Sequence, residues 1–232
     1  MMTAVEKIQH ISLADQVYAI LKQRIIKRDI QPGEKLDLNG LASRLGVSRM
    51  PVVEALTRLE SEGLVEKRDR VGTFVVPIDA RKFTEWFEMR AVIEDWAAPR
   101  IADRVTQDDI ARLDSLLAEG RKILQASQPD AFDFYAFIET YDTGFHTTLL
   151  QVAGNSFAVE IFATIHSHAR ISRSFIPRHD QLTACKLSQE GHELILGAVI
   201  SRDAVSIATT MRAHRERSHA ATLIGFREVN PL

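Results

Sequence analysis

Residues 41–76, LASRLGVSRMPVVEALTRLESEGLVEKRDRVGTFVV, constrain the fold more than any other part of the chain. Apolar residues recur at helical spacing on both sides of Gly46, which can adopt the left-handed backbone of a tight turn. Two short strand-like runs follow, joined by RDRVG. The order helix, turn, helix and β-ribbon is that of a winged helix-turn-helix, and it predicts DNA binding.

Capping residues indicate where the two helices begin. Asp37 is expected to cap the first helix and Ser48 the second. Pro51 falls in the first turn of the second helix, where a backbone N–H has no partner within the helix, so its missing N–H breaks no hydrogen bond. The second helix would bury one apolar face and present a polar N-terminal tip, the part of such helices that reads bases in the major groove. The same helix pair occurs in α-proteins that bind no DNA, but the arginine-containing ribbon favours DNA.

These residues resemble the GntR family of bacterial transcription regulators. VYAILKQRIIKRDIQPGEKL is similar to the family's first helix and PGxxL turn, the helix-turn-helix is similar nearly throughout, and GTFV is similar to the wing, so the resemblance covers about residues 12–76. It implies that Ser48 and Arg49 contact DNA and that Gly72 belongs to the wing. With the nearby arginines, the candidate DNA-binding residues are Arg44, Ser48, Arg49, Arg58, Arg70 and Gly72.

One position departs from the family pattern. Where the family has PVREAL, this chain has PVVEAL, so Val53 replaces the second arginine of the recognition helix. Loss of a guanidinium contact weakens binding by roughly 1–3 kcal/mol. Operator preference or affinity is therefore expected to be atypical.

Length and composition bound the rest of the molecule. The 232 residues allow two domains, which we place at residues 1–78 and 79–232. The first holds 12 Lys and Arg against 10 Asp and Glu; with a chain net charge of −2, the second carries −4. The single cysteine, Cys185, excludes an internal disulfide, and neither a membrane-spanning run nor a signal peptide is evident. We expect a cytoplasmic protein without a membrane partner.

Strand signals stop near Pro77, and the remaining sequence predicts helices. The fold class expected is therefore mainly α, with an N-terminal winged helix-turn-helix domain followed by an all-α helical bundle. Six helices are predicted, at residues 80–103, 106–126, 130–153, 155–176, 184–201 and 203–225.

Histidine and aspartate side chains are placed to converge in this bundle. Asp142 and His146 lie four residues apart on one predicted helix and share a face. His192 and His214 flank the turn near Asp203 at similar distances, so an antiparallel hairpin brings them to one level. Together the four would offer three nitrogens and one oxygen to a metal. Single histidines are more often structural, however, and spacing alone leaves both interpretations open.

The second domain resembles the FCD effector domain of the FadR-type branch, with a possible place in its VanR-like subgroup. The matching segments, across about residues 82–225, include DTGFHTTLLQVAGN, GHELILGAVISRDA and MRAHR. The resemblance implies that Asp142, His146, His192 and His214 bind a divalent zinc, nickel or manganese ion that helps hold a small organic acid effector. The other histidines, among them His166 and His168, are expected to be structural.

Arginines are the candidates for binding the effector's carboxylate, since a fixed guanidinium can bind it with two hydrogen bonds. Arg90 is the first choice, although a simple pair with Glu94 explains it equally well; Arg170 and Arg173 are further candidates. The expected function is a ligand-responsive transcription regulator, not an enzyme, that binds an inverted-repeat operator in double-stranded DNA as a homodimer. A metal-dependent hydrolase-like enzyme and a direct metal sensor are the alternatives.

Overall fold

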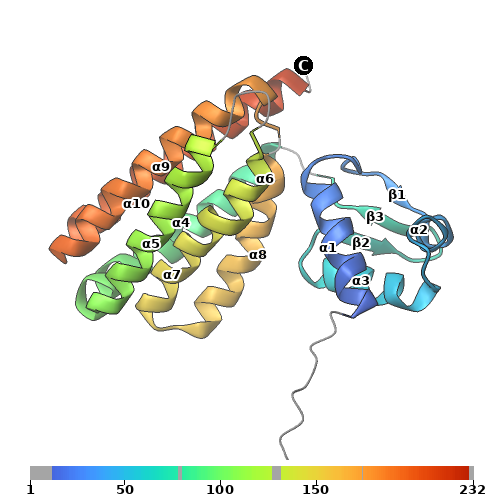
Figure 1. The fold of residues 1–232 in the computed structure, drawn as a ribbon, viewed down its shortest axis with the longest axis horizontal. Helices are drawn as coiled ribbons and strands as arrows, with labels where there is room; N and C mark the ends of the chain where they lie inside the picture. The colour runs from blue at the N-terminus through green and yellow to red at the C-terminus, as the bar shows by residue number, and fades with distance from the viewer. Residues whose placement is uncertain (1–11, 78–79, 127–131, 174, 230–232) are drawn as a thin grey trace, which may run out of the picture. The chain divides into compact units, whose positions relative to one another are not determined.

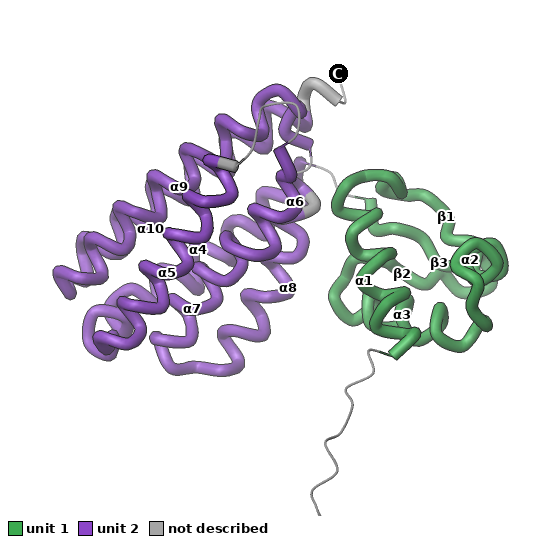
Figure 2. Tube along the Cα trace, viewed as in Figure 1, with its two compact units in different colours: residues 1–77 green, residues 78–232 purple. Residues whose placement is uncertain are grey.

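The computed structural model describes residues 12–77, 80–126, 132–173 and 175–229. The chain divides into two compact units, residues 1–77 and 78–232, coloured green and purple in Figure 2. In the described part, the first unit combines helices with a small sheet and the second contains helices alone (Figure 1). The predicted fold class is confirmed: a winged helix-turn-helix is followed by a helical bundle.

The first unit contains three helices and a three-stranded sheet. Its antiparallel strands have the order β1-β3-β2, and β2 and β3 form the hairpin of the wing. β1 was not predicted, because a strand of two residues leaves no alternation pattern. In chain order the elements are α1 (Leu13–Ile26), β1 (Lys35–Leu36), α2 (Leu38–Leu45), α3 (Arg49–Ser61), β2 (Val65–Arg68) and β3 (Gly72–Val75).

Packing and capping fix the orientation of α3 within this unit. Its buried face, which includes Val52 and Leu59, packs against α1. The Asp37 carboxylate accepts a hydrogen bond from the Asn39 N–H at 3.1 Å, and Gly46 has φ +66°, as predicted. Ser48 is the N-cap of α3, but its side chain makes no capping hydrogen bond. Its exposed hydroxyl therefore remains available to another partner.

The second unit is a bundle around one apolar core. α10 packs against α4 and α9, α4 also contacts α7 and α8, and α5 packs against α7 and α9. No described helix combines the length and apolarity needed to cross a membrane. The elements are α4 (Ala80–Arg104), α5 (Gln107–Ala126), α6 (Phe134–Ala136), the π-helix η2 (Phe137–Asp142), α7 (Thr143–Ala153), α8 (Ser156–Arg173), α9 (Arg178–Ser201) and α10 (Ala204–Val229).

Two of the predicted helices differ from the observed ones by more than a few residues at an end. α9 begins at Arg178, six residues before the predicted start, because Pro177 supplies the N-cap and the polar first turns carry no apolar periodicity. The helix expected at 130–153 is interrupted by a π-helical stretch that ends at Asp142, where the Thr143 hydroxyl donates to the Ile138 carbonyl at 2.8 Å. Residues 127–131 lie outside the described part. Such π-helical insertions are frequent at functional sites.

Candidate functional site

Three histidines from three helices meet in the core of the second unit. His146 lies on α7, His192 on α9 and His214 on α10, and all three are buried. The Nε2 atom of His192 lies 3.1 Å from Nε2 of His146 and 3.1 Å from Nε2 of His214. The hairpin of α9 and α10 therefore brings the two later histidines to one level, as their spacing predicted.

The geometry of this cluster fits a divalent cation. Zinc–nitrogen bonds of about 2.0–2.1 Å in a tetrahedron separate neighbouring ligand nitrogens by roughly 3.3 Å. Suitable ligand atoms of the three histidines all lie within 4.8 Å of one another. Burial, above all, holds the pKa values of His146 and His214 well below the ordinary range, and that of His192 at about 3. Neutral imidazoles, the form that binds metals, are therefore present at neutral pH.

A tyrosine orients one of the three rings. His192 Nδ1 lies 2.6 Å from the buried hydroxyl of Tyr141, at the end of η2. Because Nε2 faces the other histidines, we assign the proton to Nδ1, which then donates to the tyrosine oxygen. Partners of this kind fix the tautomer of metal-binding histidines. Tyr141 was not recognised as a site residue in the sequence, although it lies next to Asp142.

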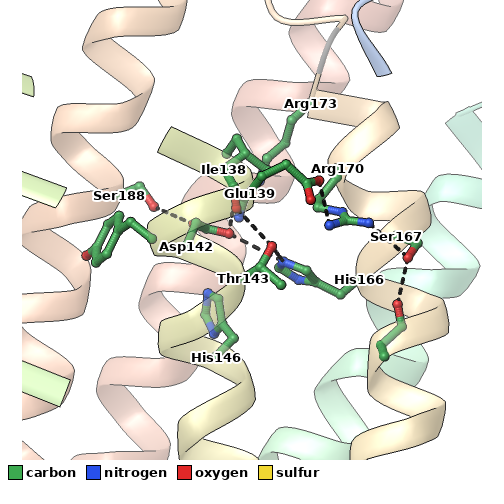
Figure 3. Close-up of polar contacts among 12 residues, drawn as sticks. Ile138, Glu139, Asp142, Thr143, His146, His166, Ser167, Arg170, Arg173 and Ser188 are labelled. Atoms are coloured by element: carbon green, nitrogen blue, oxygen red, sulfur yellow. Dashed lines mark hydrogen bonds and ion pairs between the residues drawn. The ribbon is translucent and has the colours of Figure 1, made fainter. Parts of the chain in front are cut away.

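Asp142 lies beside the cluster and has several partners (Figure 3). Its Oδ1 is 3.8 Å from His192 Nε2 and accepts from the Ser188 hydroxyl at 3.3 Å, while Oδ2 lies 2.8 Å from Arg173 Nη1 and 3.5 Å from His166 Nε2. Burial raises the pKa of this carboxyl, but Arg173 and the nearby histidines outweigh that effect and lower the pKa well below its ordinary value. The result is a buried carboxylate beside the cluster. It is not part of the group of described residues whose ligand atoms lie within 4.8 Å of one another, so its role as a fourth ligand stays a prediction.

Arg90 links the cluster to a buried ion-pair network. Its Nε lies 2.6 Å from a Glu94 oxygen, and its Nη2 lies 3.1 Å from Nε2 of His146. Glu94 also pairs with Arg215 at 2.7 Å, so one carboxylate is shared by two guanidinium groups. Arg90 thus forms the ion pair with Glu94 that the sequence suggested and also lies beside the histidine cluster. The guanidinium and a cation compete for the same lone pair of His146.

The other two candidate arginines lie at the end of α8. Arg170 pairs with Glu139 at 2.5 Å and donates to the Ser167 hydroxyl, whereas Arg173 reaches Asp142 and also lines a pocket. This pocket has a volume of about 480 Å³, part of it open to solvent, and is formed by α6, η2, α9, α10 and residues near the end of α8. His214 also lines it. A ligand in this pocket would therefore contact His214, one member of the histidine cluster.

Gly191 permits the close approach of α9 and α10. A Cβ atom at this position would lie 2.6 Å from His214 Nδ1, closer than real contacts allow, and 3.0 Å from Arg217 Nη2. Because Gly191 has no side chain, the ring of His214 can lie close enough to His192 to belong to the cluster. Sequence spacing alone did not assign this role to the glycine.

Acidification is expected to destabilise the metal-free protein. In the unfolded chain, His192 is protonated once the pH falls below its ordinary pKa of 6.5. In the folded chain, burial lowers this pKa to about 3, so His192 stays neutral down to about pH 3. Stability is therefore full above pH 6.5 and decreases as the pH falls through this window. For His192 alone, the loss between about pH 7 and pH 5 is about 2 kcal/mol. Urea unfolding at several pH values, with a chelator present, measures this loss of stability. If His192→Ala shows the same pH dependence as the unchanged protein, His192 is not its cause.

The candidate DNA-binding residues lie on α2, α3 and the wing. Ser48 and Arg49 are exposed at the N-terminus of α3, and Arg44 is exposed near the end of α2. Arg70 has φ +61° in the turn of the wing. Gly72 has φ +134°, a backbone conformation that residues with a side chain rarely adopt, whereas the nearest atom to a Cβ there, Cε of Lys35 at 2.8 Å, belongs to a flexible side chain that can move.

Arg58 differs from the other candidates because its side chain contacts α1. Its Nη1 lies 2.5 Å from Asp15, and its guanidinium carbon lies 4.0 Å from the centre of the Tyr18 ring. A hydrogen bond from Ser12 and the contact with Arg58 lower the pKa of Asp15. Arg58 therefore stabilises the contact of α3 with α1 in this structure, and its contact with DNA stays a prediction.

Comparison with known families and proteins agrees with this architecture. Residues 13–75 match the model described as bacterial regulatory proteins of the gntR family, and residues 85–217 match the FCD domain. The HTH-type transcriptional repressor RspR of Escherichia coli is 28% identical over 199 residues, covering 86% of this chain and 84% of RspR. An uncharacterized HTH-type regulator of Streptomyces ambofaciens is likewise 28% identical, covering 85% of this chain and 80% of its own length.

A solved structure shares the fold. E. coli McbR/YncC superimposes with a TM-score of 0.74 at 23% identity, covering 95% of this chain and all of that one. The matched families and the relatives are transcriptional regulators and not enzymes. This chain thus belongs to the GntR family of bacterial transcriptional regulators, with an N-terminal helix-turn-helix domain and the FCD domain that fits the FadR branch.

Proposed function

We propose that this regulator binds an inverted-repeat operator as a cytoplasmic homodimer and that a small carboxylate ligand modulates its affinity for DNA. The ligand would lie beside a divalent ion held by Asp142, His146, His192 and His214. Imidazole with carboxylate suits zinc and nickel, and the oxygen ligand also suits manganese. When bound, the ion would supply a fixed positive charge that attracts a carboxylate.

One observation carries this proposal: three buried, neutral imidazoles converge in the FCD domain of a helix-turn-helix protein, and one of them, His214, lines a pocket. Neutral histidine nitrogens cannot all satisfy one another, because two lone pairs that face each other repel. A cation would satisfy them together. The neighbouring guanidinium groups of Arg90 and Arg173 add positive charge, which favours an anionic ligand.

The ligand's effect on DNA would arise from a choice between two arrangements of the dimer. A molecule in the pocket contacts η2, α9 and α10 at once, so it stabilises the arrangement of these helices to which it binds most tightly. Two recognition helices bind one operator only when their separation matches that of the half-sites. A small change in this separation is therefore enough to change affinity. Because the similar protein RspR is named a repressor, we propose repression here as well.

The decisive experiment recovers and sequences the genomic DNA that the purified, metal-loaded protein binds. A few enriched sites that share an inverted repeat would support the proposal. Absence of enrichment, with and without added zinc, nickel or manganese, would contradict it. If the metal alone released the recovered sites, the direct metal sensor would replace the carboxylate-responsive regulator.

Restoration of the second family arginine is expected to strengthen DNA binding. Val53 is 42% exposed on α3, so a guanidinium fits there without disturbing the core. Val53→Arg should raise operator affinity by roughly 5-fold to 150-fold per half-site, the equivalent of about 1–3 kcal/mol. Titration of a labelled operator measures this change, with Val53→Gln as the uncharged control. An affinity of the arginine variant equal to that of the unchanged protein would show that a guanidinium at position 53 does not contact DNA.

A further inference from the structure

The pocket beside the histidine cluster has polar and apolar parts. Arg173, Ser188, His214 and Arg217 line it with polar groups. Most of its remaining lining is apolar and includes Phe134, Phe137, Ile138, Ile176, Ala184 and Leu187. No aspartate or glutamate is among the described residues that line it. The pocket thus offers cations to one part of a ligand and hydrocarbon to the rest.

Arg173 is prepared to bind an anion. Its side chain is 5% exposed, and Nη1 is held 2.8 Å from Asp142. Its other terminal nitrogen, Nη2, is buried and has no hydrogen-bond partner in the described part of the chain. A buried donor without a partner is costly, and a ligand oxygen would remove that cost. Because Asp142 fixes the guanidinium, little side-chain entropy is lost when the ligand binds.

The apolar walls exclude a heavily hydroxylated ligand. Each ligand hydroxyl that leaves water without a new hydrogen bond lowers affinity, and aliphatic and phenyl side chains offer none. Cys185 does not change this conclusion, because burial raises the pKa of its thiol and keeps it neutral. Methylene groups, in contrast, gain affinity when the same walls remove them from water.

We infer that the ligand is a monocarboxylate with a hydrocarbon body, rather than a sugar acid or a tricarboxylate. This inference rests on the proposed function, because it names the class of effector for the same site. The carboxylate lies at Arg173 and the histidine cluster, and the hydrocarbon lies against the phenyl and aliphatic side chains. The pocket's volume of about 480 Å³ includes space that is open to solvent, so part of a bound ligand would remain in contact with water.

Calorimetric titration of the full-length, zinc-loaded protein tests this inference. Butanoate, hexanoate and octanoate are compared with one another, and hexanoate is compared with gluconate, which has the same number of carbons but hydroxyl groups along its chain. Affinity is expected to increase roughly fourfold with each added methylene, and gluconate should bind at least tenfold more weakly than hexanoate. Hexanol, which lacks the carboxylate, should also bind at least tenfold more weakly than hexanoate.

Two variants of α9 separate binding in the pocket from non-specific association. Ala184→Leu fills the pocket and should weaken octanoate binding at least tenfold, with zinc affinity unchanged. Thr183→Leu adds the same side chain at an exposed neighbour outside the pocket lining and should leave octanoate binding unchanged. Equal losses in the two variants would overturn the inference.

The remaining outcomes distinguish the ligand class from the proposed function. If gluconate or citrate binds as tightly as hexanoate, or if affinity does not depend on chain length, the hydrocarbon class is wrong and carboxylate regulation stands. If none of these acids binds the zinc-loaded protein while it still binds its genomic sites, the inference and the effector part of the proposed function both fail. DNA binding itself would be unaffected by that result.

Discussion

Arg49→Ala is expected to abolish operator binding at working concentrations, with a loss of roughly 30-fold to 25,000-fold in affinity. Arg49 is the first residue of α3, its side chain is exposed, and the described residues provide no ion pair for it. Its guanidinium is therefore available to a base edge or a phosphate. One such contact contributes about 1–3 kcal/mol, and the proposed homodimer would lose two of them. Anisotropy of a fluorescent operator duplex at fixed salt measures the change.

A matched control is available in the other unit. Arg178 is exposed at the start of α9, so Arg178→Ala removes the same charge outside the DNA-binding domain and should leave operator affinity nearly unchanged. Arg58→Ala tests a different effect, because that side chain contacts Asp15 and Tyr18 and its loss should lower the stability of the first unit. Operator affinity equal in Arg49→Ala and Arg178→Ala would contradict the assignment of α3 as the recognition helix.

The recognition helix could be placed from sequence because its signals are local. Capping by Asp37 and the left-handed Gly46 depend on a few neighbouring residues, and both were confirmed. The proximity of His192 and His214 could also be predicted. Their helices are consecutive and antiparallel, and the two residues lie at similar distances from the short turn between them. These features need no knowledge of how distant segments pack.

Contacts between segments distant in sequence could not be predicted in the same way. The π-helical stretch before Asp142 has no pattern in the residues that form it. His166 was expected to be structural, and its ring lies 3.5 Å from Asp142, a partner that the sequence did not predict. Such contacts depend on how α8 packs in the bundle, which is a property of the whole core.

His192→Ala is expected to reduce zinc affinity roughly 100-fold to 1,000-fold. The residue is fully buried, and its Nε2 atom lies 3.1 Å from both other imidazole nitrogens, so it is the centre of the cluster. Structural zinc sites with four ligands bind with about 10–16 kcal/mol, and one ligand therefore represents roughly 3–4 kcal/mol. Competition with a fluorescent zinc chelator at neutral pH measures the loss.

Exposed His179, on the same helix, provides the control. Its side chain is 79% exposed and distant in sequence from the cluster, so His179→Ala should retain full zinc affinity. The His192 variant should also lose its response to the carboxylate while it still binds the operator, because the recognition helix belongs to a separate compact unit. Carboxylate-induced release of DNA that survives in folded His192→Ala would show that neither the ion nor this imidazole takes part in the response.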